Sequence, residues 1–336
     1  MTLVPASSNT ATKPITSASI QIGWRESVQE DLGKVTEKIQ AVSFLDNPML
    51  DAAINMIIEA GGKRMRPAIT MMVGRACGAN YDHAISVAAS VELLHTATLV
   101  HDDLIDKAEE RRGAPTLHMQ LPLGVTVLTG DFLFAQSAAL AAEAGNVRVV
   151  QVFSETLVNI CKGEILQAQT RWQVPDIQTY IQRIYGKTAA LFEAAAISGA
   201  ILGHQDESVI QAFKTFGHEL GLAFQIVDDA LDFVSDATKL GKPAGHDVRQ
   251  GHFNLPIMLY LEDSNIDADT LIEQARHEQG VEDLVAIVRE QGFAHETLRI
   301  ARKHVARAEA ALDTIGWSPA LEPLLDLAQY AVARDF

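Results

Sequence analysis

Residues 91–116 read VELLHTATLVHDDLIDKAEERRGAPT, and the rest of the chain can be interpreted outward from this stretch. Small and apolar residues lead into the pattern DDxxD, formed by Asp102, Asp103 and Asp106, which predicts the end of a buried helix. Asp102 and Asp106 are four residues apart and therefore lie on one helix face. Two carboxylates this close repel each other unless a cation lies between them. Ligands that are all hard oxygen atoms favour Mg²⁺ over zinc or iron.

A second copy of the pattern lies in FQIVDDALDF, residues 224–233, with Asp228, Asp229 and Asp232. Gln225, Asp229 and Asp232 share one helical face, and Asp228 borders it. A single DDxxD is equally typical of an exposed acidic helix end, but two copies on apolar helices are hard to explain by solvation. If the two copies face each other, they form a cage for several divalent ions and a diphosphate.

Composition narrows the class of protein. The chain has 336 residues, a net charge of −16 and 48% hydrophobic residues. The acidic balance argues against nucleic acid as a partner. The chain contains no run of about 18 uncharged apolar residues, so no membrane anchor is expected. The two cysteines, Cys77 and Cys161, lack CxxC spacing, which fits a reducing, cytoplasmic location.

The helical pattern runs through most of the chain. Residues 1–22 are rich in Ser, Thr, Ala and Pro and are expected to be a disordered tail. This tail lacks acidic residues, as transit peptides do, but it also lacks their arginines. From Trp24 onward, apolar residues recur every three or four positions between short Gly, Pro and Asn breaks. We expect residues 23–336 to form one all-α domain of ten or more helices around a central cavity.

Basic residues cluster near Gly and Pro. The segment GGKRMRP, residues 61–67, places three cations just before a helix that begins near Pro67. Arg111 and Arg112 follow the first aspartate pattern, where they could bind phosphate oxygens. Two further basic positions lie in GKTAALF and in LGKPAGHD, and they are Lys187, followed by Thr188, and Lys242. Each segment alone is equally compatible with an ordinary surface turn.

Together these segments resemble the trans-isoprenyl diphosphate synthases, which join prenyl units head to tail. The matching motifs occur in the family's order over about residues 25–334: GGKRMRP, HDDLID, RRGAPT, GDFLFAQS, GKTAALF, AFQIVDDALDF and LGKPAGHD. The resemblance implies the isoprenoid-synthase bundle, a homodimer, and several Mg²⁺ ions in each active site. It also implies two substrates, isopentenyl diphosphate and an allylic diphosphate, and a greasy product whose release involves transient membrane contact.

The resemblance also implies roles for individual residues. It assigns Mg²⁺ to Asp102, Asp106, Asp228 and Asp232, and catalytic or supporting roles to Asp103, Asp229 and Lys187. The allylic diphosphate would be contacted by Arg111, Lys187, Thr188, Gln225 and Lys242. Isopentenyl diphosphate would be held by Lys63, Arg66, His95 and Arg112.

One segment departs from the family pattern. The family often has GKxTLP after the second aspartate motif, and its lysine reaches the allylic diphosphate. Here residues 251–256 read GHFNLP, with His252 at the lysine position and Asn254 at the threonine position. A neutral histidine is a weaker phosphate contact than a lysine, so the lysine's role is not carried over.

Product length depends on the residues that precede the first aspartate motif. In the family, a bulky aromatic residue four or five positions before Asp102 stops growth at farnesyl length. Here these positions are Thr98 and Ala97, followed one turn further back by Leu94. The small size of Ala97 and Thr98 predicts a product of geranylgeranyl length or longer, with a long quinone-type chain favoured, and Ala97→Phe is expected to shorten it. The helix around residues 158–169 is expected to close the cavity.

Other functions remain open on the sequence. A geranylgeranyl diphosphate synthase would share all of these motifs, and a terpene cyclase would share the first aspartate motif. A regulatory subunit of a heteromeric prenyltransferase would have lost aspartates or arginines that this chain keeps. The ExxH spacing of Glu92 and His95 occurs in di-iron bundles, and the doublet His101–Asp102 occurs in metal phosphohydrolases, but the partner motifs of both are missing.

Overall fold

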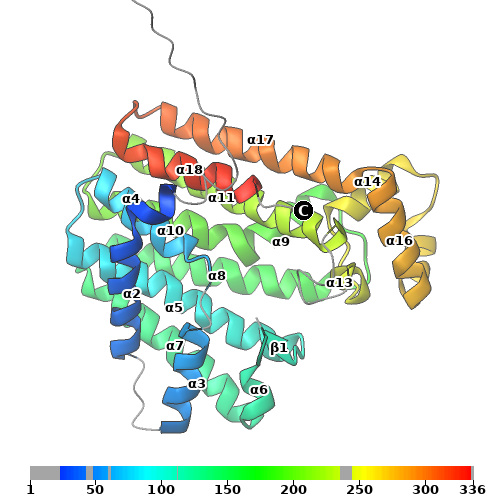
Figure 1. Ribbon diagram of the computed structural model, residues 1–336, viewed down its shortest axis with the longest axis horizontal. Coiled ribbons are helices and arrows are strands. Elements are labelled where there is room, and N and C mark those ends of the chain that lie inside the picture. The colour runs from blue at the N-terminus through cyan, green and yellow to red at the C-terminus, as the bar shows by residue number, and fades with distance from the viewer. Residues whose placement is uncertain (1–22, 43–47, 60–61, 112, 235–243, 334–336) are drawn as a thin grey trace, which may run out of the picture.

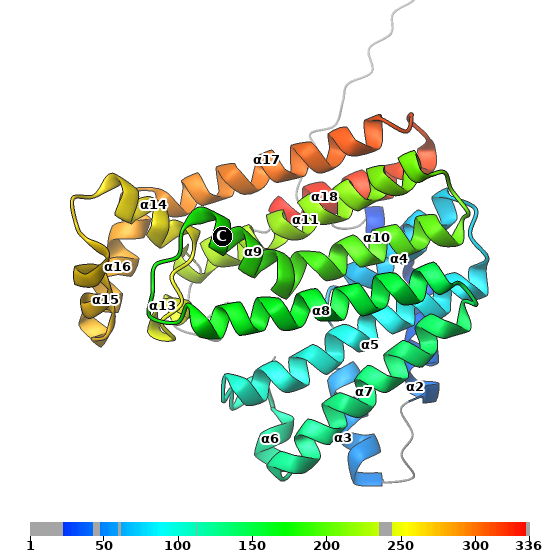
Figure 2. The same cartoon turned by 180° about the vertical axis from the view of Figure 1, so that it is seen from behind.

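The computed structural model describes residues 23–42, 48–59, 62–111, 113–234 and 244–333. Within these ranges the chain is a bundle of helices with one β-hairpin, whose two strands have two residues each (Figures 1 and 2). The predicted all-α class is therefore confirmed. The expected tail at residues 1–22 lies outside the described residues. The expectation of a single domain over 23–336 stays a prediction.

The elements follow one another in short connections. The first part of the chain contains α2 (Gln29–Val42), α3 (Pro48–Glu59), α4 (Met65–Ala76), α5 (Tyr81–Ile105), β1 (Glu110–Arg111), β2 (Ala114–Pro115), α6 (Leu117–Gln120), α7 (Leu123–Glu143) and α8 (Val147–Gln169). The middle part contains α9 (Ile177–Ile184), η1 (Tyr185–Ala189), α10 (Ala190–Leu202) and α11 (Glu207–Val234). The last part contains α13 (His246–Arg249), α14 (Leu255–Asp263), α15 (Ala268–Ala275), α16 (Glu278–Glu290), α17 (Phe293–Asp313), η2 (Pro319–Leu321) and α18 (Glu322–Val332).

Helix α10 is the centre of the bundle. Its sequence, ALFEAAAISGAIL, consists mostly of small and apolar residues, and every one of them is buried. It packs against α4, α5, α8 and α11, which surround it (Figure 2). A Cβ atom at Gly199 would lie 2.8 Å from the backbone nitrogen of Gly74 on α4. The glycine therefore allows the two helices to approach closely, and it fixes the core on which the longer helices rest.

Helices α5 and α11 carry the two aspartate motifs at their C-terminal ends. Asn80 begins α5 by accepting a hydrogen bond from the backbone N–H of His83. Most of α5 is buried, because it packs against α7 on one side and α4 on another. Helix α11 is 28 residues long and packs along α17 and α10. Both motifs therefore stand on long helices whose position is fixed by the core.

A π-helical turn, η1, joins α9 to α10. Such wider turns are uncommon and often occur at functional sites. Here a pair of glycines brings the backbone of α8 against it. A Cβ atom at Gly163 would lie 2.6 Å from the backbone nitrogen of Lys187, and one at Gly186 would lie 2.7 Å from the Cα atom of Gly163. Only glycine at both positions allows α8 to lie this close to Lys187.

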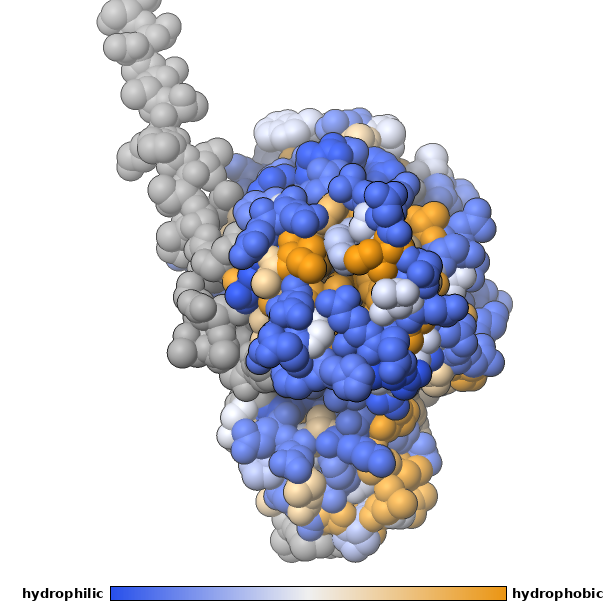
Figure 3. Space-filling view, turned by 90° about the vertical axis from the view of Figure 1, so that its right-hand side faces the viewer, coloured by the Kyte–Doolittle hydropathy of each residue, from blue (hydrophilic) through white to orange (hydrophobic). Residues whose placement is uncertain are grey.

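Two described helices, α5 and α7, are long and apolar enough to cross a membrane by length and composition. The most apolar part of α5 is 78% buried within the protein, so α5 is a core helix. The corresponding part of α7 is only 39% buried. Met119 on α6 and Leu123 and Leu128 on α7 are exposed apolar side chains. Figure 3 shows an apolar patch in the lower part of the molecule, the part that holds α3, α6 and α7 in Figures 1 and 2.

Candidate active site

A cavity of about 380 Å³ lies between the ends of α5 and α11. Residues from both aspartate motifs line it, together with lysine and arginine side chains from three separate segments of the chain. The predicted site residues that line this cavity are Lys63, Arg66, His95, Thr98, Asp102, Asp106, Arg111, Lys187, Thr188, Gln225 and Asp228. The structure therefore brings together most of the side chains that the sequence singled out.

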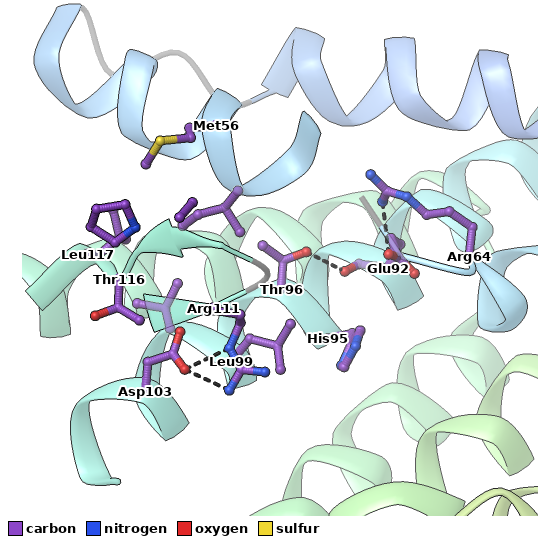
Figure 4. Close-up of a pocket in the computed structure, with 14 residues that line it drawn as sticks. Met56, Arg64, Glu92, His95, Thr96, Leu99, Asp103, Arg111, Thr116 and Leu117 are labelled. Carbon is purple, nitrogen blue, oxygen red and sulfur yellow. Dashed lines mark hydrogen bonds and ion pairs between the residues drawn. The ribbon is translucent and has the colours of Figure 1, made fainter. Parts of the chain in front are cut away.

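The first aspartate motif divides between two faces of α5. Asp102 and Asp106 line the cavity, as their spacing predicted. Asp103 points to the other side of the helix, where it is 7% exposed. There it accepts hydrogen bonds from Nε and Nη2 of Arg111 at 2.7 and 2.6 Å (Figure 4). This geometry favours Asp103 as the residue that positions Arg111 rather than as a metal ligand.

The second aspartate motif is divided in a similar way. Asp228 lines the main cavity, but Asp229 is buried behind it. Asp229 accepts hydrogen bonds from the hydroxyl of Tyr180 at 2.7 Å and from Nε2 of Gln225 at 2.9 Å. Asp232 accepts the backbone N–H groups of His246 and Asp247. Both oxygens of Asp232 are thus used to fix the chain that follows α11, which favours a supporting role.

Burial and mutual repulsion oppose ionisation of these carboxyl groups. Burial, and then repulsion from Glu164, raise the pKa of Asp102 from 3.8 to about 7. Burial, and then repulsion from Asp247, raise the pKa values of Asp229 and Asp232 to about 7. For each group such a rise corresponds to about 4 kcal/mol against the charged form. Nearby cations would reverse this penalty, so the carboxyl groups form a site suited to metal ions.

Lys187 projects from η1 toward the first aspartate motif. Its Nζ lies 3.4 Å from Glu164 and 3.3 Å from Oε1 of Gln167, both on α8. Burial lowers the pKa of Lys187, but Glu164, Asp102 and Asp106 outweigh it, so the net change is upward. The lysine is therefore charged at neutral pH. The next residue, Thr188, donates a hydrogen bond to Oε1 of Gln225 at 2.6 Å, which links η1 to α11.

Residues 62–66 of the segment GGKRMRP line the same cavity as Lys187 and Thr188 of η1. Nζ of Lys63 is 5.3 Å from the ring centroid of Tyr330 on α18, and the guanidinium of Arg66 is 4.6 Å from that of Phe192 on α10. These cation–π contacts place two positive charges at the rim of the cavity. His95 faces the same cavity from α5. Three of the four residues predicted to hold isopentenyl diphosphate, Lys63, Arg66 and His95, therefore line the same cavity.

Figure 4 shows a second feature of this region, a small cavity of about 50 Å³ on the rear face of α5. Here Nη1 of Arg64 lies 2.9 Å from Oε1 of Glu92, and both side chains are largely buried. Arg64 has a backbone φ of 52°, a left-handed conformation that is unfavourable for a non-glycine residue. Its ion pair with Glu92 fixes this strained residue, which follows Lys63 and lies two positions before Arg66.

Several residues of the site were not predicted as such. The sequence analysis missed Arg64, Gln167, Tyr180 and Asp247, and it assigned Glu92 only to a di-iron alternative. Glu164 was not selected either, yet it pairs with Lys187. Their contacts join segments that are far apart in the sequence, so spacing carries no signal of them. Arg112 and Lys242 lie outside the described residues.

The residues predicted to control product length separate in the structure. Thr98 lines the main cavity, whereas Leu94 lines a small apolar pocket deeper between α5, α7, α8 and α10. Ala97 is fully buried in the core and lines neither. On α8 the deep pocket is bounded by Val149, Val152, Phe153 and Thr156, which precede the segment 158–169 that the sequence analysis expected to close it.

The donor atoms of the site fit Mg²⁺. The main cavity offers carboxylate oxygens from both helices and no cysteine. Among the described residues, no three His, Cys, Asp or Glu side chains come close enough to hold a metal ion by themselves. A metal shell at this site must therefore be completed by other oxygen atoms, and those of a diphosphate and of water suit it.

Comparisons with known proteins agree with this geometry. Residues 47–290 match the family model for polyprenyl synthetase. The chain is 38% identical to the geranyl-diphosphate-specific all-trans-nonaprenyl-diphosphate synthase of Rhodobacter capsulatus, over 91% of this chain and 98% of that protein. It is 35% identical to heptaprenyl diphosphate synthase component 2 of Geobacillus stearothermophilus, over 92% of this chain and 97% of that protein.

A solved structure is similar throughout. The polyprenyl synthase of Caulobacter crescentus, crystallised with calcium and isoprenyl diphosphate, superposes with a TM-score of 0.88 at 33% identity. The match covers 96% of this chain and 99% of that one. The chain therefore belongs to the polyprenyl synthetase family and is a polyprenyl diphosphate synthase, an enzyme that transfers prenyl groups.

Proposed function

We propose that the protein condenses isopentenyl diphosphate with an allylic diphosphate, using Mg²⁺, to make an all-trans polyprenyl diphosphate of geranylgeranyl length or longer. The observation that carries this proposal is the single cavity that Asp102, Asp106 and Asp228 share with Lys187, Lys63 and Arg66. The carboxylates repel one another unless metal ions lie between them, and the lysine and arginine side chains attract anions. A diphosphate bound to metal ions balances both sets of charges.

The carboxylates of Asp102, Asp106 and Asp228 would hold the Mg²⁺ ions, with Asp229 and Asp232 supporting them from behind. The metal supplies charge stabilisation for the departing diphosphate. Lys187, Thr188, Gln225 and Arg111 would orient the allylic diphosphate, and Lys242 remains a prediction for the same group. Lys63, Arg66 and His95 would bind isopentenyl diphosphate, and Arg112 remains a prediction for that site.

The reaction breaks the bond between the allylic carbon and its diphosphate oxygen. The double bond of isopentenyl diphosphate forms the new carbon–carbon bond, and a proton then leaves, most simply to the departed diphosphate. The protein contributes position and electrostatic stabilisation. Phe192 and Phe224, whose ring centroids are 5.2 Å apart, line the cavity and would keep water from the electron-poor carbon.

The growing tail would leave the main cavity along α5 and α10. Thr98 on the cavity and Leu94 on the deep pocket are one helical turn apart on α5. On α10 the same path runs from Phe192 to Ala194 and Ser198. The small side chains of Thr98 on α5 and of Ala194 and Ser198 on α10 support a long product. The names of two relatives, a nonaprenyl and a heptaprenyl diphosphate synthase, support it as well.

We also propose that the enzyme is a cytoplasmic homodimer. The poorly buried apolar helix α7, with Leu123 and Leu128 exposed, supports association between two copies. The unpaired thiols of Cys77 and Cys161 support a reducing compartment. The name of the Geobacillus relative, component 2, makes a heteromer the alternative. Light scattering on the purified chain distinguishes a dimer from a monomer that requires a partner.

The direct test uses purified protein, Mg²⁺ and labelled isopentenyl diphosphate with dimethylallyl, geranyl, farnesyl or geranylgeranyl diphosphate as primer. Products are dephosphorylated and sized by reversed-phase chromatography. We expect a ladder with a sharp upper limit at or beyond geranylgeranyl length. Folded, metal-supplied protein that incorporates no label with any primer would contradict the proposal and favour a cyclase or a dependent subunit.

A further inference from the structure

A second, polar cavity of about 120 Å³ opens beside the main one, behind the second aspartate motif. It shares Asp106, Lys187 and Gln225 with the main cavity, so the two are neighbours along the same walls. Its other walls come from α9, α13 and the loop before α14. The additional lining residues are Gln167, Arg183, Ile184, Asp229, His246, Asp247, Gln250, His252 and Asn254.

Two nitrogen atoms in the walls of this cavity have no partner among the described residues. One is Nη1 of Arg183, whose side chain is 98% buried as judged from its 2% exposure. The other is Nδ1 of His252, which is also inaccessible to solvent. A buried guanidinium nitrogen without an acceptor is costly, because it has lost water and gained nothing. Nη1 of Arg183 can only donate, so it points to an acceptor that enters the cavity.

The rest of the Arg183 side chain is held firmly. Its Nη2 donates to the backbone oxygen of Phe253 at 3.2 Å and to Oδ1 of Asn254 at 2.5 Å. Its guanidinium also lies 5.7 Å from the ring centroid of Tyr180. Nη2 therefore holds the loop before α14 in place, whereas Nη1 makes no hydrogen bond within the described residues. Arg183 is one helical turn before Lys187, and both line the cavity.

The chemistry of the walls selects the ligand. Two cations, Arg183 and Lys187, make a bare metal ion unfavourable at this end of the cavity. Three carboxyl groups, those of Asp106, Asp229 and Asp247, make a bare anion equally unfavourable. A phosphoryl group that arrives with its own Mg²⁺ satisfies both sets of charges. The cavity is also large enough for such a group or for a few waters.

We propose that Arg183, with His252, forms a further phosphoryl-binding subsite that receives one end of the Mg²⁺-bound diphosphate. Nη1 of Arg183 donates to a phosphoryl oxygen from beneath, while Lys187 contacts the diphosphate from the side of the main cavity. The inference rests on the proposed function, because it takes the diphosphate as the ligand. It adds an arginine that the motifs of the chain do not include.

The test measures binding of inorganic diphosphate with Mg²⁺ by titration calorimetry, which needs no turnover. Arg183→Met is expected to weaken binding about 10- to 100-fold, the range for one lost charge-assisted hydrogen bond. Arg171→Met is the matched control. Arg171 also bonds to this loop, at the backbone oxygen of Gln250, but it is exposed and does not line the cavity.

A second variant separates charge from structure. His252→Lys places an ammonium group in the same cavity, so in the Arg183→Met background it is expected to restore most of the lost affinity. Unchanged diphosphate binding in Arg183→Met would overturn the inference and leave only water in the cavity. Weakened binding without rescue by His252→Lys, in folded protein, would also overturn it and make Arg183 a brace for Asn254. No binding of Mg²⁺ and diphosphate to the wild-type protein would instead contradict the proposed function.

Discussion

Replacing Asp102 by Asn should stabilise the metal-free enzyme, and the gain should grow with pH. Burial and repulsion from Glu164 raise the pKa of Asp102 from 3.8 to about 7 in the folded state. Between about pH 4 and 7 the unfolded chain has therefore lost this proton while the folded chain keeps it. Over that window the folded state loses about 1.4 kcal/mol of stability per pH unit, and above pH 7 the loss is complete.

An amide at position 102 has no proton to lose in this range. The gap between the variant and the wild type should therefore widen by about 3 kcal/mol from pH 5 to pH 7 and then stay constant. Urea unfolding followed by circular dichroism, with a chelator present, measures the free energy at pH 5, 6, 7 and 8. Asp82→Asn, on the exposed first turn of the same helix, is the control and should show no such widening.

Two results would refute this reasoning. A gap that is the same at pH 5 and pH 8 would mean that Asp102 ionises normally in the folded protein. A variant that is less stable than the wild type at pH 8 would mean that the charged carboxylate is already stabilised without metal. Either result would remove the electrostatic argument for a metal ion at this position.

Three further predictions follow from the same geometry. Thr98→Phe should shorten the product, because Thr98 lines the cavity, whereas Thr98→Ser should leave its length unchanged in the chromatographic assay. Gly186→Ala should cost about 1–3 kcal/mol in unfolding free energy and raise KM for the allylic substrate, because the new methyl would lie 2.6 Å from the backbone oxygen of Asn159. Glu92→Gln should raise KM for isopentenyl diphosphate about tenfold, because Arg64 loses a buried partner; an equal rise for the allylic substrate would contradict this.

The sequence predicted the fold class and most residues of the main cavity, because helical periodicity and motif order are local signals. Helical spacing predicted that Asp102 and Asp106 share a face of α5. It gave no sign that Asp103, on another face, accepts hydrogen bonds from Arg111. The sequence also did not predict that Ala97 lies in the core. Neighbouring residues on a helix point about 100° apart, so Thr98 faces the cavity while Ala97 does not.

The contacts that fix the site were invisible for another reason. Arg64 and Glu92 form an ion pair although they are 28 positions apart in the sequence. Lys187 on η1 likewise pairs with Glu164 on α8. Neither pairing follows a fixed spacing, so only the packing of α4, α5, α8 and η1 reveals it. That Nη1 of Arg183 lacks a partner depends on all the segments that surround the cavity, so no single stretch of sequence could predict it.

The π-helical turn at residues 185–189 has a consequence for how this site could change. A π turn is an α-helix with one residue too many. Deleting that surplus residue would let α9 run straight into α10, with a tighter and more stable backbone. The same deletion would rotate α9 by about 100° relative to α10. Lys187 would then leave Glu164, and Arg183 would leave Asn254. Lys187, which we propose orients the allylic diphosphate, therefore lies on a π-helical turn that an uninterrupted α-helix would not contain.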